Sequence, residues 1–352
     1  MIRSFLALLA ALIGLSATMA AHAEPVDGGH ARVELVSERE TATPGERLWL
    51  GLSFEMDPNW HIYWLNAGDA GIPPSIRWTE DTSLEPSVFG DFSWPLPELI
   101  PVVEDEIMDY GYSGTVVLPF PVTIPAGTDD AVRLSAEVNY LICEEICIPE
   151  TVELELFMDV GETQVPDRAN AGRIAAALAD VPPAFEGEAQ LTDKGERWIL
   201  SATGGDLAGL TGEARFFPET HDIIHAAAQP ATFGPSGLSL ELVPDTDTAP
   251  ETLRGILRVH PEKGDPVAVN IVAGQGDVLG GTSGVSASGG SSPGAGEQGR
   301  NATGLAGPRG IVFLMSMALL GGLILNLMPC VLPVLSIKAV GMVHAAASGE
   351  RG

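Results

Sequence analysis

Cysteine and positive charge are both scarce in this sequence. The chain has 352 residues but 3 cysteines, which excludes a small scaffold held together by disulfides. Lysine and arginine total 18 against 47 aspartates and glutamates, so the formal net charge is -29. Binding to a nucleic-acid backbone depends on clustered cations, and the sequence therefore argues against nucleic acid as a partner. So few cysteines leave each of them available for chemistry.

The first 23 residues have the layout of a secretory signal peptide. Arg3 precedes an apolar run from Phe5 to about Leu15, and Ala21-His22-Ala23 supplies small residues for cleavage. The run is short for a membrane span, which favours a cleaved signal over a retained anchor. We therefore expect the mature, exported chain to begin near Glu24.

Most of the exported part reads as β structure. Short alternating or β-branched runs, separated by glycine and proline, extend from Arg32 to about Val160 and again from Phe185 to Val272. Between them, residues 167–180 have the composition and spacing of a short helix. We expect a mainly β protein with two immunoglobulin-like β-sandwich domains, at 24–163 and 164–274, the second including the connecting helix.

The composition changes towards the C-terminus. Residues 275–307 are dominated by glycine, serine, alanine and threonine, which bury too little apolar surface to fold and predict a flexible linker. The uncharged stretch between Arg309 and Lys338 is long enough for a transmembrane helix within residues 308–347. Because this stretch contains two prolines, which are unusual in a lone anchor, we expect it to be the start of a truncated polytopic membrane domain.

Cys143 and Cys147 carry the strongest chemical signal. Strand-like residues flank the Cys-Glu-Glu-Ile-Cys segment on both sides. A hairpin with residues 144–146 at its tip would bring the two cysteines to bonding distance. A single continuous strand would hold them about 13 Å apart. The spacing therefore predicts a hairpin or a helical turn.

Three uses of this pair stay open from the residues alone: a redox couple, a structural bridge, or half of a metal site. Closing a loop of about five residues stabilises a fold by only about 2 kcal/mol, and a metal site would need further ligands. Glu144 and Glu145 disfavour a thiolate, so we expect exchange to be slow except with docked partners. The alternative function is a membrane-tethered envelope binding protein or chaperone with a structural disulfide.

Aromatic residues gather in two further segments. One begins at Trp60-His-Ile-Tyr-Trp and is either core structure or a surface for docking a partner. The other, Phe92 through Tyr112, is either an ordinary loop or a flap that shields the cysteines. The residues assigned to this possible cap or docking surface are Trp60, Tyr63, Trp64, Asp105, Tyr110 and Tyr112.

Taken together and in this order, several motifs resemble the DsbD/ScsB family of transmembrane thiol:disulfide interchange reductases. They are Trp60-His-Ile-Tyr-Trp, Gly68-Asp-Ala-Gly-Ile-Pro-Pro, Tyr110-Gly-Tyr, the Cys143/Cys147 segment, Phe216-Phe-Pro and Asn326-Leu-Met-Pro-Cys-Val-Leu-Pro. The resemblance implies an immunoglobulin-like exported domain, a polytopic membrane domain and a carboxy-terminal thioredoxin-like domain. It also implies a bacterial inner-membrane location, with residues 24 to about 307 in the periplasm, and a link to cytochrome c biogenesis.

The same resemblance implies a direction of electron flow. Electrons pass from cytoplasmic thioredoxin through membrane cysteines and a thioredoxin-like domain to the amino-terminal pair, and then to oxidised thioredoxin-fold proteins of the envelope. Cys143 and Cys147 match that terminal pair, with Cys147 forming the mixed disulfide and Cys143 resolving it. Cys330 matches the first membrane cysteine. We expect this chain to be part of a larger disulfide reductase that requires neither a bound cofactor nor a metal.

Overall fold

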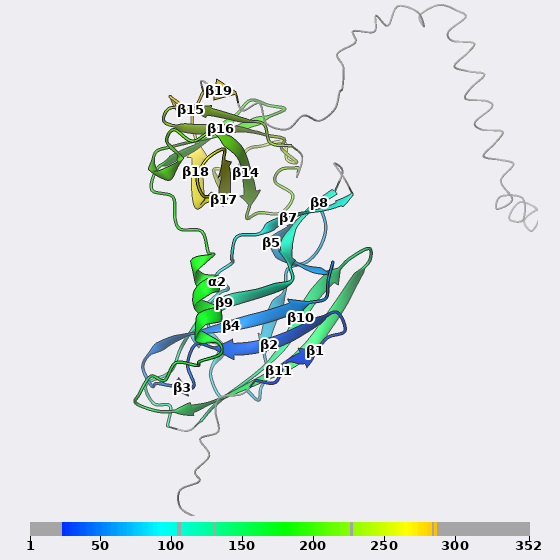
Figure 1. The fold of residues 1–352 in the computed structure, drawn as a ribbon, viewed down its shortest axis with the longest axis vertical. Coiled ribbons are helices and arrows are strands. Elements are labelled where there is room, and N and C mark those ends of the chain that lie inside the picture. Colours follow the sequence, from blue (N-terminus) through cyan, green and yellow to red (C-terminus); the bar gives the residue numbers. More distant parts are fainter. Residues whose placement is uncertain (1–22, 104–106, 130, 226–227, 284, 287–352) are drawn as a thin grey trace, which may run out of the picture. The chain divides into compact units, whose positions relative to one another are not determined.

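The computed structural model describes the part of the chain that was expected to fold outside the membrane. It covers residues 23–103, 107–129, 131–225, 228–283 and 285–286. Three predictions lie outside these residues: the signal peptide, the transmembrane helix at 308–347 with Cys330, and the docking residue Asp105. Strands dominate the described chain, which confirms the mainly β prediction (Figure 1). Among the described residues, no helix is long and apolar enough to cross a membrane.

In the region predicted as the first β domain, two sheets enclose an apolar core. One sheet has the order β1-β2-β4-β9, and the other has the order β3-β11-β10-β5-β8-β7, with β6 paired to β10. Side chains such as Leu35, Leu52 and Leu156, with at most 1% of their surface exposed, share this core. The elements are β1 (Val26–Asp27), β2 (Ala31–Ser37), β3 (Thr41–Ala42), β4 (Arg47–Met56), β5 (His61–Gly68), β6 (Ser75–Trp78), the 3-10 helix η1 (Pro86–Val88), β7 (Glu98–Val103), β8 (Ile107–Ser113), β9 (Thr115–Thr123), β10 (Val132–Cys143) and β11 (Cys147–Val160).

Strand β11 shows how the sequence pattern becomes a sheet face. Val152, Leu154 and Leu156 are buried, while Glu153 and Glu155 between them are exposed. Successive side chains of a strand point to opposite faces, so this alternation places one face on the core and the other in water. The predicted face assignment for this segment is confirmed.

Helix α2 (Ala171–Ala179) follows the first domain at the position where the sequence predicts a helix. It packs on β9 and β4, on the side away from the main core (Figure 1). Ile174 and Ala177 of the helix form a small apolar cluster with Val36 and Val117. The Asp167 carboxylate accepts hydrogen bonds from the backbone of Ala169 and Asn170, at 2.8 and 2.9 Å, and so orders the turn that begins the helix.

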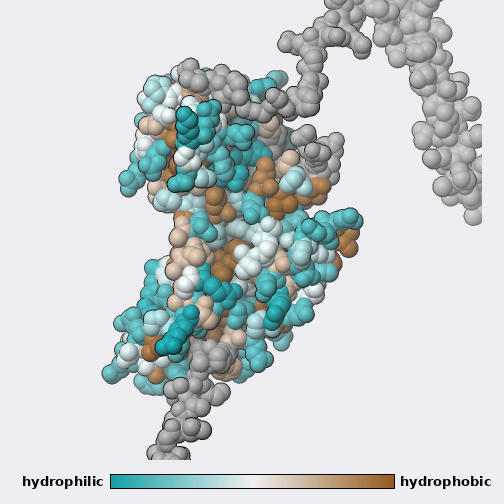
Figure 2. Space-filling view, viewed as in Figure 1, coloured by the Kyte–Doolittle hydropathy of each residue, from teal (hydrophilic) through white to brown (hydrophobic). Residues whose placement is uncertain are grey.

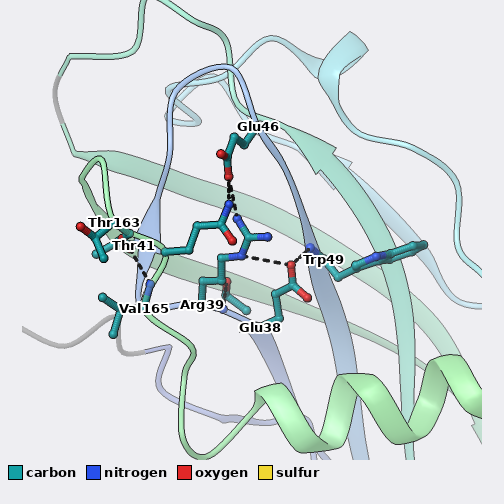
Figure 3. Close-up of polar contacts among 9 residues, drawn as sticks. Glu38, Arg39, Thr41, Glu46, Trp49, Thr163 and Val165 are labelled. Atoms are coloured by element: carbon teal, nitrogen blue, oxygen red, sulfur yellow. Dashed lines mark hydrogen bonds and ion pairs between the residues drawn. The ribbon is translucent and has the colours of Figure 1, made fainter.

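A polar cluster fastens the segment after β11 to the first domain (Figure 3). Arg39 lies between two carboxylates, 3.4 Å from Glu38 and 3.2 Å from Glu46. Glu38 also accepts a hydrogen bond from the backbone N–H of Trp49 at 3.0 Å, and Gln164 bonds to Glu46. Glu46 therefore joins Arg39, which lies just before β3, to Gln164 in the chain leaving β11.

Replacing Arg39 with alanine is expected to lower the free energy of unfolding by about 1 kcal/mol, since two partly buried carboxylates lose their shared cation. Arg133→Ala is the matched control, because its ion pair with Glu155 lies on an exposed face. We expect that control to cost less than about 0.5 kcal/mol. Urea unfolding of both variants measures the difference, and an equal loss in the two would contradict the role given to the cluster.

In the region predicted as the second β domain, a single hydrogen-bonded sheet folds over its own core. The strand order is β14-β17-β18-β12-β13-β16-β15-β19, and β14 also lies against β16. Buried residues from both halves of the sheet, such as Leu240 and Leu257, share one apolar cluster. The elements are β12 (Glu188–Asp193), β13 (Trp198–Thr203), the 3-10 helix η2 (Gly205–Leu207), β14 (Gly212–Pro218), β15 (Ala231–Gly234), β16 (Gly237–Leu242), β17 (Thr252–Pro261), β18 (Val267–Gln275) and β19 (Val285–Ser286).

The structure corrects the predicted start of the flexible linker at residue 275. Residues 276–282 belong to the second β domain, where the backbone N–H groups of Gly276 and Ser236 donate to the carbonyls of Leu191 and Gly281. Thr282 is fully buried. Backbone hydrogen bonds need no apolar side chain, so a Gly- and Ser-rich composition does not reveal them. The linker beyond residue 286 lies outside the described residues.

Hydrophilic residues cover much of the visible face of the described chain, with apolar residues scattered between them (Figure 2). This distribution agrees with the excess of acidic residues in the sequence. A few large apolar side chains are exposed, among them Ile72 and Ile146, and single exposed side chains of this kind are normal on a protein surface.

Candidate redox site

Cys143 and Cys147 end the two strands of one hairpin. Strands β10 and β11 pair antiparallel without interruption from Val132 opposite Met158 to Cys143 opposite Cys147. The two cysteines form a disulfide, with a Cα–Cα distance of 4.2 Å. Residues 144–146 make the turn. The predicted hairpin is therefore present, and the alternative of a helical turn is not adopted.

The two cysteines differ in exposure. Cys143 is only 2% exposed, whereas Cys147 belongs to the exposed end of the hairpin with Glu144, Glu145 and Ile146. Ile142, the neighbour of Cys143, faces the main core, so Cys143 points to the opposite side of the sheet. A reactant from solution can reach Cys147 directly, while the other sulfur lies behind it.

A small second cluster buries Cys143 on this outer side of the sheet. It consists of Tyr63, Ala67 and Cys143, with Leu141 packed against them. The Tyr63 hydroxyl donates a hydrogen bond to the sulfur of Cys143 at 2.8 Å and lies 3.6 Å from the sulfur of Cys147. Tyr63 itself has no exposed surface. The disulfide thus has a hydroxyl group at its buried end.

Tyr63 and Trp64 are neighbours in β5, so the alternation of a strand points their side chains to opposite faces of the sheet. Beyond Tyr63 the pairing with β8 is irregular, because Tyr63 pairs with Gly111 while Gly68 pairs with Asp109. Tyr63 reaches the disulfide, while Trp64 points into the main core.

The loop after β5 closes over Tyr63. Gly71 has a φ angle of +109°, and a Cβ atom at this position would lie 2.2 Å from Cε1 of Tyr63. Only glycine combines this backbone conformation with so close an approach to the ring. The loop is tied to β8, because Ala70 donates its N–H to the Asp109 carboxylate at 3.1 Å and Met108 donates to Asp69 at 2.8 Å.

Asp109 is a buried carboxyl group behind Tyr63. It is 1% exposed, and its carboxyl group lies beside the Tyr63 hydroxyl. Burial raises the pKa of Asp109 to about 6, although the Ala70 N–H and the Tyr63 hydroxyl act in the opposite direction. Burial and the nearby Asp109 both raise the pKa of Tyr63, so its hydroxyl keeps its proton at neutral pH.

His61 is a further buried side chain near Asp109. Its Nε2 atom lies 3.9 Å from the Asp109 carboxylate and makes no hydrogen bond. Burial lowers the pKa of His61, which favours the neutral imidazole. Within the described residues, no group of three or more histidine, cysteine, aspartate or glutamate side chains could hold a metal ion.

Comparison with known proteins identifies this region. Residues 32–159 match the family model described as thiol:disulfide interchange protein DsbD, N-terminal. This region is similar to the N-terminal domain of DsbD. The resemblance seen in the sequence is thereby confirmed, and we refer to residues 32–159 as the DsbD-type domain.

A solved structure extends the likeness beyond the DsbD-type domain. The crystal structure of the N-terminal periplasmic domain of ScsB from Proteus mirabilis covers 73% of this chain and 99% of its own length, with a TM-score of 0.53. At 20% sequence identity, this match shows a shared fold. Spo0M, a sporulation control protein from Bacillus subtilis, matches 69% of this chain at 10% identity, but its TM-score of 0.19 is too low to indicate a common fold. Curated protein sequences gave no match.

Within the DsbD-type domain, the predicted docking residues fall into two groups. Tyr63 contacts the disulfide, as described above. For Trp60, Trp64, Tyr110 and Tyr112 the core alternative holds, because at most 9% of each side chain is exposed. The Tyr112 hydroxyl, for example, donates to the carbonyl of Pro95 at 2.8 Å. Side chains buried in this way cannot form a surface for a partner.

The predicted flap at residues 92–112 is likewise part of the fold. Among its described residues, Phe92 and Trp94 pack against the main core, residues 98–103 form β7, and residues 107–112 lie in β8. Asp109 of this segment lies beside Tyr63, which contacts the disulfide, and the sequence motifs did not include it. His61 was also missed. Both stand next to recognised motifs, because Asp109 directly precedes Tyr110-Gly-Tyr and His61 lies inside Trp60-His-Ile-Tyr-Trp.

Proposed function

We propose that this chain delivers electrons to oxidised thioredoxin-fold proteins of the cell envelope by thiol–disulfide exchange at Cys143 and Cys147. The observation that carries the proposal is the unequal placement of the two sulfurs in a DsbD-type domain, one at an exposed hairpin end and one buried under a tyrosine hydroxyl. A structural bridge gains nothing from this inequality. An exchange reaction needs it, because one sulfur must meet the partner and the other must release it.

The reaction begins with the reduced pair. The Cys147 thiolate attacks a sulfur of the partner's disulfide, which forms a mixed disulfide and releases one partner thiolate. Cys143 then attacks the sulfur of Cys147, so the intramolecular disulfide forms and the second partner sulfur leaves as a thiolate. The partner gains two electrons and, with two protons from solvent, becomes a dithiol. Proximity makes the second step fast, because the cysteines already face each other across the hairpin.

The source of the electrons belongs to the same proposal. The DsbD-type domain supports a relay in which the membrane part of the full-length protein reduces the pair, with Cys330 as its first cysteine. The ScsB domain of similar fold is described as periplasmic, which supports an envelope location for residues 24 to about 307 at the bacterial inner membrane. A thioredoxin-like domain and further membrane helices would complete the route.

Electron transfer to a thioredoxin-fold protein tests this function directly. We expect the reduced chain, freed of excess reductant, to reduce oxidised thioredoxin with one disulfide exchanged per chain. The double variant Cys143→Ala, Cys147→Ala is expected to transfer nothing, which controls for Cys330. The partner's thiols are counted by mass after alkylation. If the wild-type chain leaves this partner and other thioredoxin-fold proteins oxidised, the pair is a structural bridge.

A further inference from the structure

The Tyr63 hydroxyl stands between two groups that compete for its single proton. It lies 2.8 Å from the sulfur of Cys143, and the buried Asp109 carboxyl group of the neighbouring strand β8 lies beside it. A hydroxyl group donates one hydrogen bond at a time but can accept another. When Asp109 is protonated, it can donate to Tyr63, and Tyr63 donates to Cys143. When Asp109 is ionised, the carboxylate attracts the tyrosine proton, and the sulfur loses its donor.

The surroundings of Asp109 leave both protonation states accessible. The ionisable side chains that face it are Tyr63 and His61 of β5 and Asp69 of the following loop. Its partner on β7, Ile100, carries no charge. His61 favours its neutral form, and the negative charge of Asp69 works against ionisation of Asp109. Among the described residues, none of the groups that shift the pKa of Asp109 is a cation that would hold it in its ionised form.

We propose that Asp109 and Tyr63 form a proton relay that serves Cys143 during disulfide exchange. This inference rests on the proposed function and deepens it by naming how the buried sulfur gains and loses its proton. Cys143 needs such a relay because it is 2% exposed, so water cannot reach it as it reaches Cys147. Tyr63 touches the reacting sulfur, whereas Asp109 acts through Tyr63.

The relay operates when a thiolate reduces the disulfide. The thiolate attacks the sulfur of Cys147, a new disulfide bond forms, and the bond between Cys147 and Cys143 breaks. The electron pair of the broken bond moves to the Cys143 sulfur. That sulfur takes the proton of the Tyr63 hydroxyl, and Tyr63 takes the proton of the Asp109 carboxylic acid. The products are a neutral Cys143 thiol, a neutral tyrosine and an Asp109 carboxylate.

The same path returns the proton when the pair is oxidised again. Cys143 must become a thiolate before it can attack the mixed disulfide at Cys147. Its proton passes to Tyr63 while the proton of Tyr63 passes to the Asp109 carboxylate. One proton thus moves between Asp109 and Cys143 in both half-reactions, and only the proton of Cys147 exchanges directly with solvent.

The test is the pH dependence of the rate at which dithiothreitol reduces the oxidised full-length chain, divided by the concentration of dithiothreitol thiolate. In the wild type we expect this corrected rate to fall about tenfold as pH rises through about 6, where Asp109 loses its proton. Asp109→Asn and Tyr63→Phe are expected to be slow at low pH and to show no such fall. Above pH 8, Asp109→Asn is expected to match the wild type.

Asp69→Asn provides the matched control. Asp69 faces Asp109 but bonds to the backbone of Met108, and an asparagine can still accept that hydrogen bond. Loss of its charge is expected to move the fall in rate to lower pH without changing its size. Asp109→Asn would overturn the relay if it kept the fall, or if it slowed the reaction equally at every pH, as a purely structural role would.

Tyr63→Phe tests the relay even if Asp109→Asn does not fold, because it removes only one hydroxyl group. A wild-type profile in Tyr63→Phe would also overturn the relay. The assay uses a small dithiol and no protein partner. Failure of the relay is therefore separate from failure of the proposed function, which shows as an inability to exchange with thioredoxin-fold proteins.

Discussion

Cys143→Ala is expected to accumulate a stable mixed disulfide between Cys147 and a thioredoxin-fold partner, while Cys147→Ala accumulates none. In the first variant, the exposed cysteine can still attack the partner, but no second cysteine faces it to release the product. In the second variant, the remaining cysteine is 2% exposed and lies under Tyr63. The partner cannot approach that sulfur while the small cluster stays closed.

Both variants are best made on a Cys330→Ala background, so that each chain has a single thiol. Oxidised thioredoxin is added to the reduced variant, and the covalent complex is measured by non-reducing electrophoresis and mass spectrometry. Equal trapping by the two variants, or preferential trapping by Cys147→Ala, would contradict the assigned order of attack.

The same asymmetry can be measured without a partner. If the cluster over Cys143 opens at a cost of about 3 kcal/mol, iodoacetamide should modify Cys147 about a hundredfold faster than Cys143 in the reduced protein. The pH dependence of the Cys147 rate also tests the influence of Glu144 and Glu145. Half-maximal reactivity well below neutral pH would contradict the expectation that these acids disfavour the thiolate.

Leu52→Ala and Leu240→Ala are expected to destabilise different parts of the chain, each by about 2–5 kcal/mol. Both leucines are fully buried, but Leu52 belongs to the core of the first β domain and Leu240 to the core of the second. Each substitution leaves a cavity that only its own core can partly fill. The disulfide lies outside both cores, on the outer side of the first domain's sheet.

Calorimetry with hydrogen exchange distinguishes the two effects. We expect Leu240→Ala to weaken protection in β12–β18 and to leave the rate of disulfide reduction unchanged, because the exchange site belongs to the first domain. Leu52→Ala serves as the reciprocal control. If both variants lower one common transition by the same amount, the two β domains unfold as one cooperative unit, and the predicted division near residue 163 is wrong.

Much of the fold could be predicted because its signals are local. The alternation in residues 152–156, the helical spacing near residue 174 and the strand-like flanks of Cys143 and Cys147 each depend on neighbouring residues. The predicted start of the linker failed for a related reason. Residues 276–282 are held by backbone hydrogen bonds, which leave no mark on side-chain composition.

The site itself could be predicted only in part. Trp60 and Tyr63 belong to the same motif, yet one lies in the main core and the other touches the disulfide. Strand alternation sends the two side chains to opposite faces, but which face meets the disulfide depends on the pairing of β5 with β10 and β8, which a single strand does not reveal. The place of Asp109 in the site could not be predicted, because it is 46 positions from Tyr63 in the sequence and lies beside it only through this pairing.

By itself, the sequence determined that this chain is a mainly β protein with a hairpin that joins two cysteines, because strand periodicity and the spacing of the pair are local properties. It also contained the motifs of the DsbD-type domain. Tertiary structure alone decided which cysteine is buried, which tyrosine reaches it and which carboxyl group stands behind that tyrosine. These features arise where separate strands and a loop meet, and the chemistry of the site depends on that meeting.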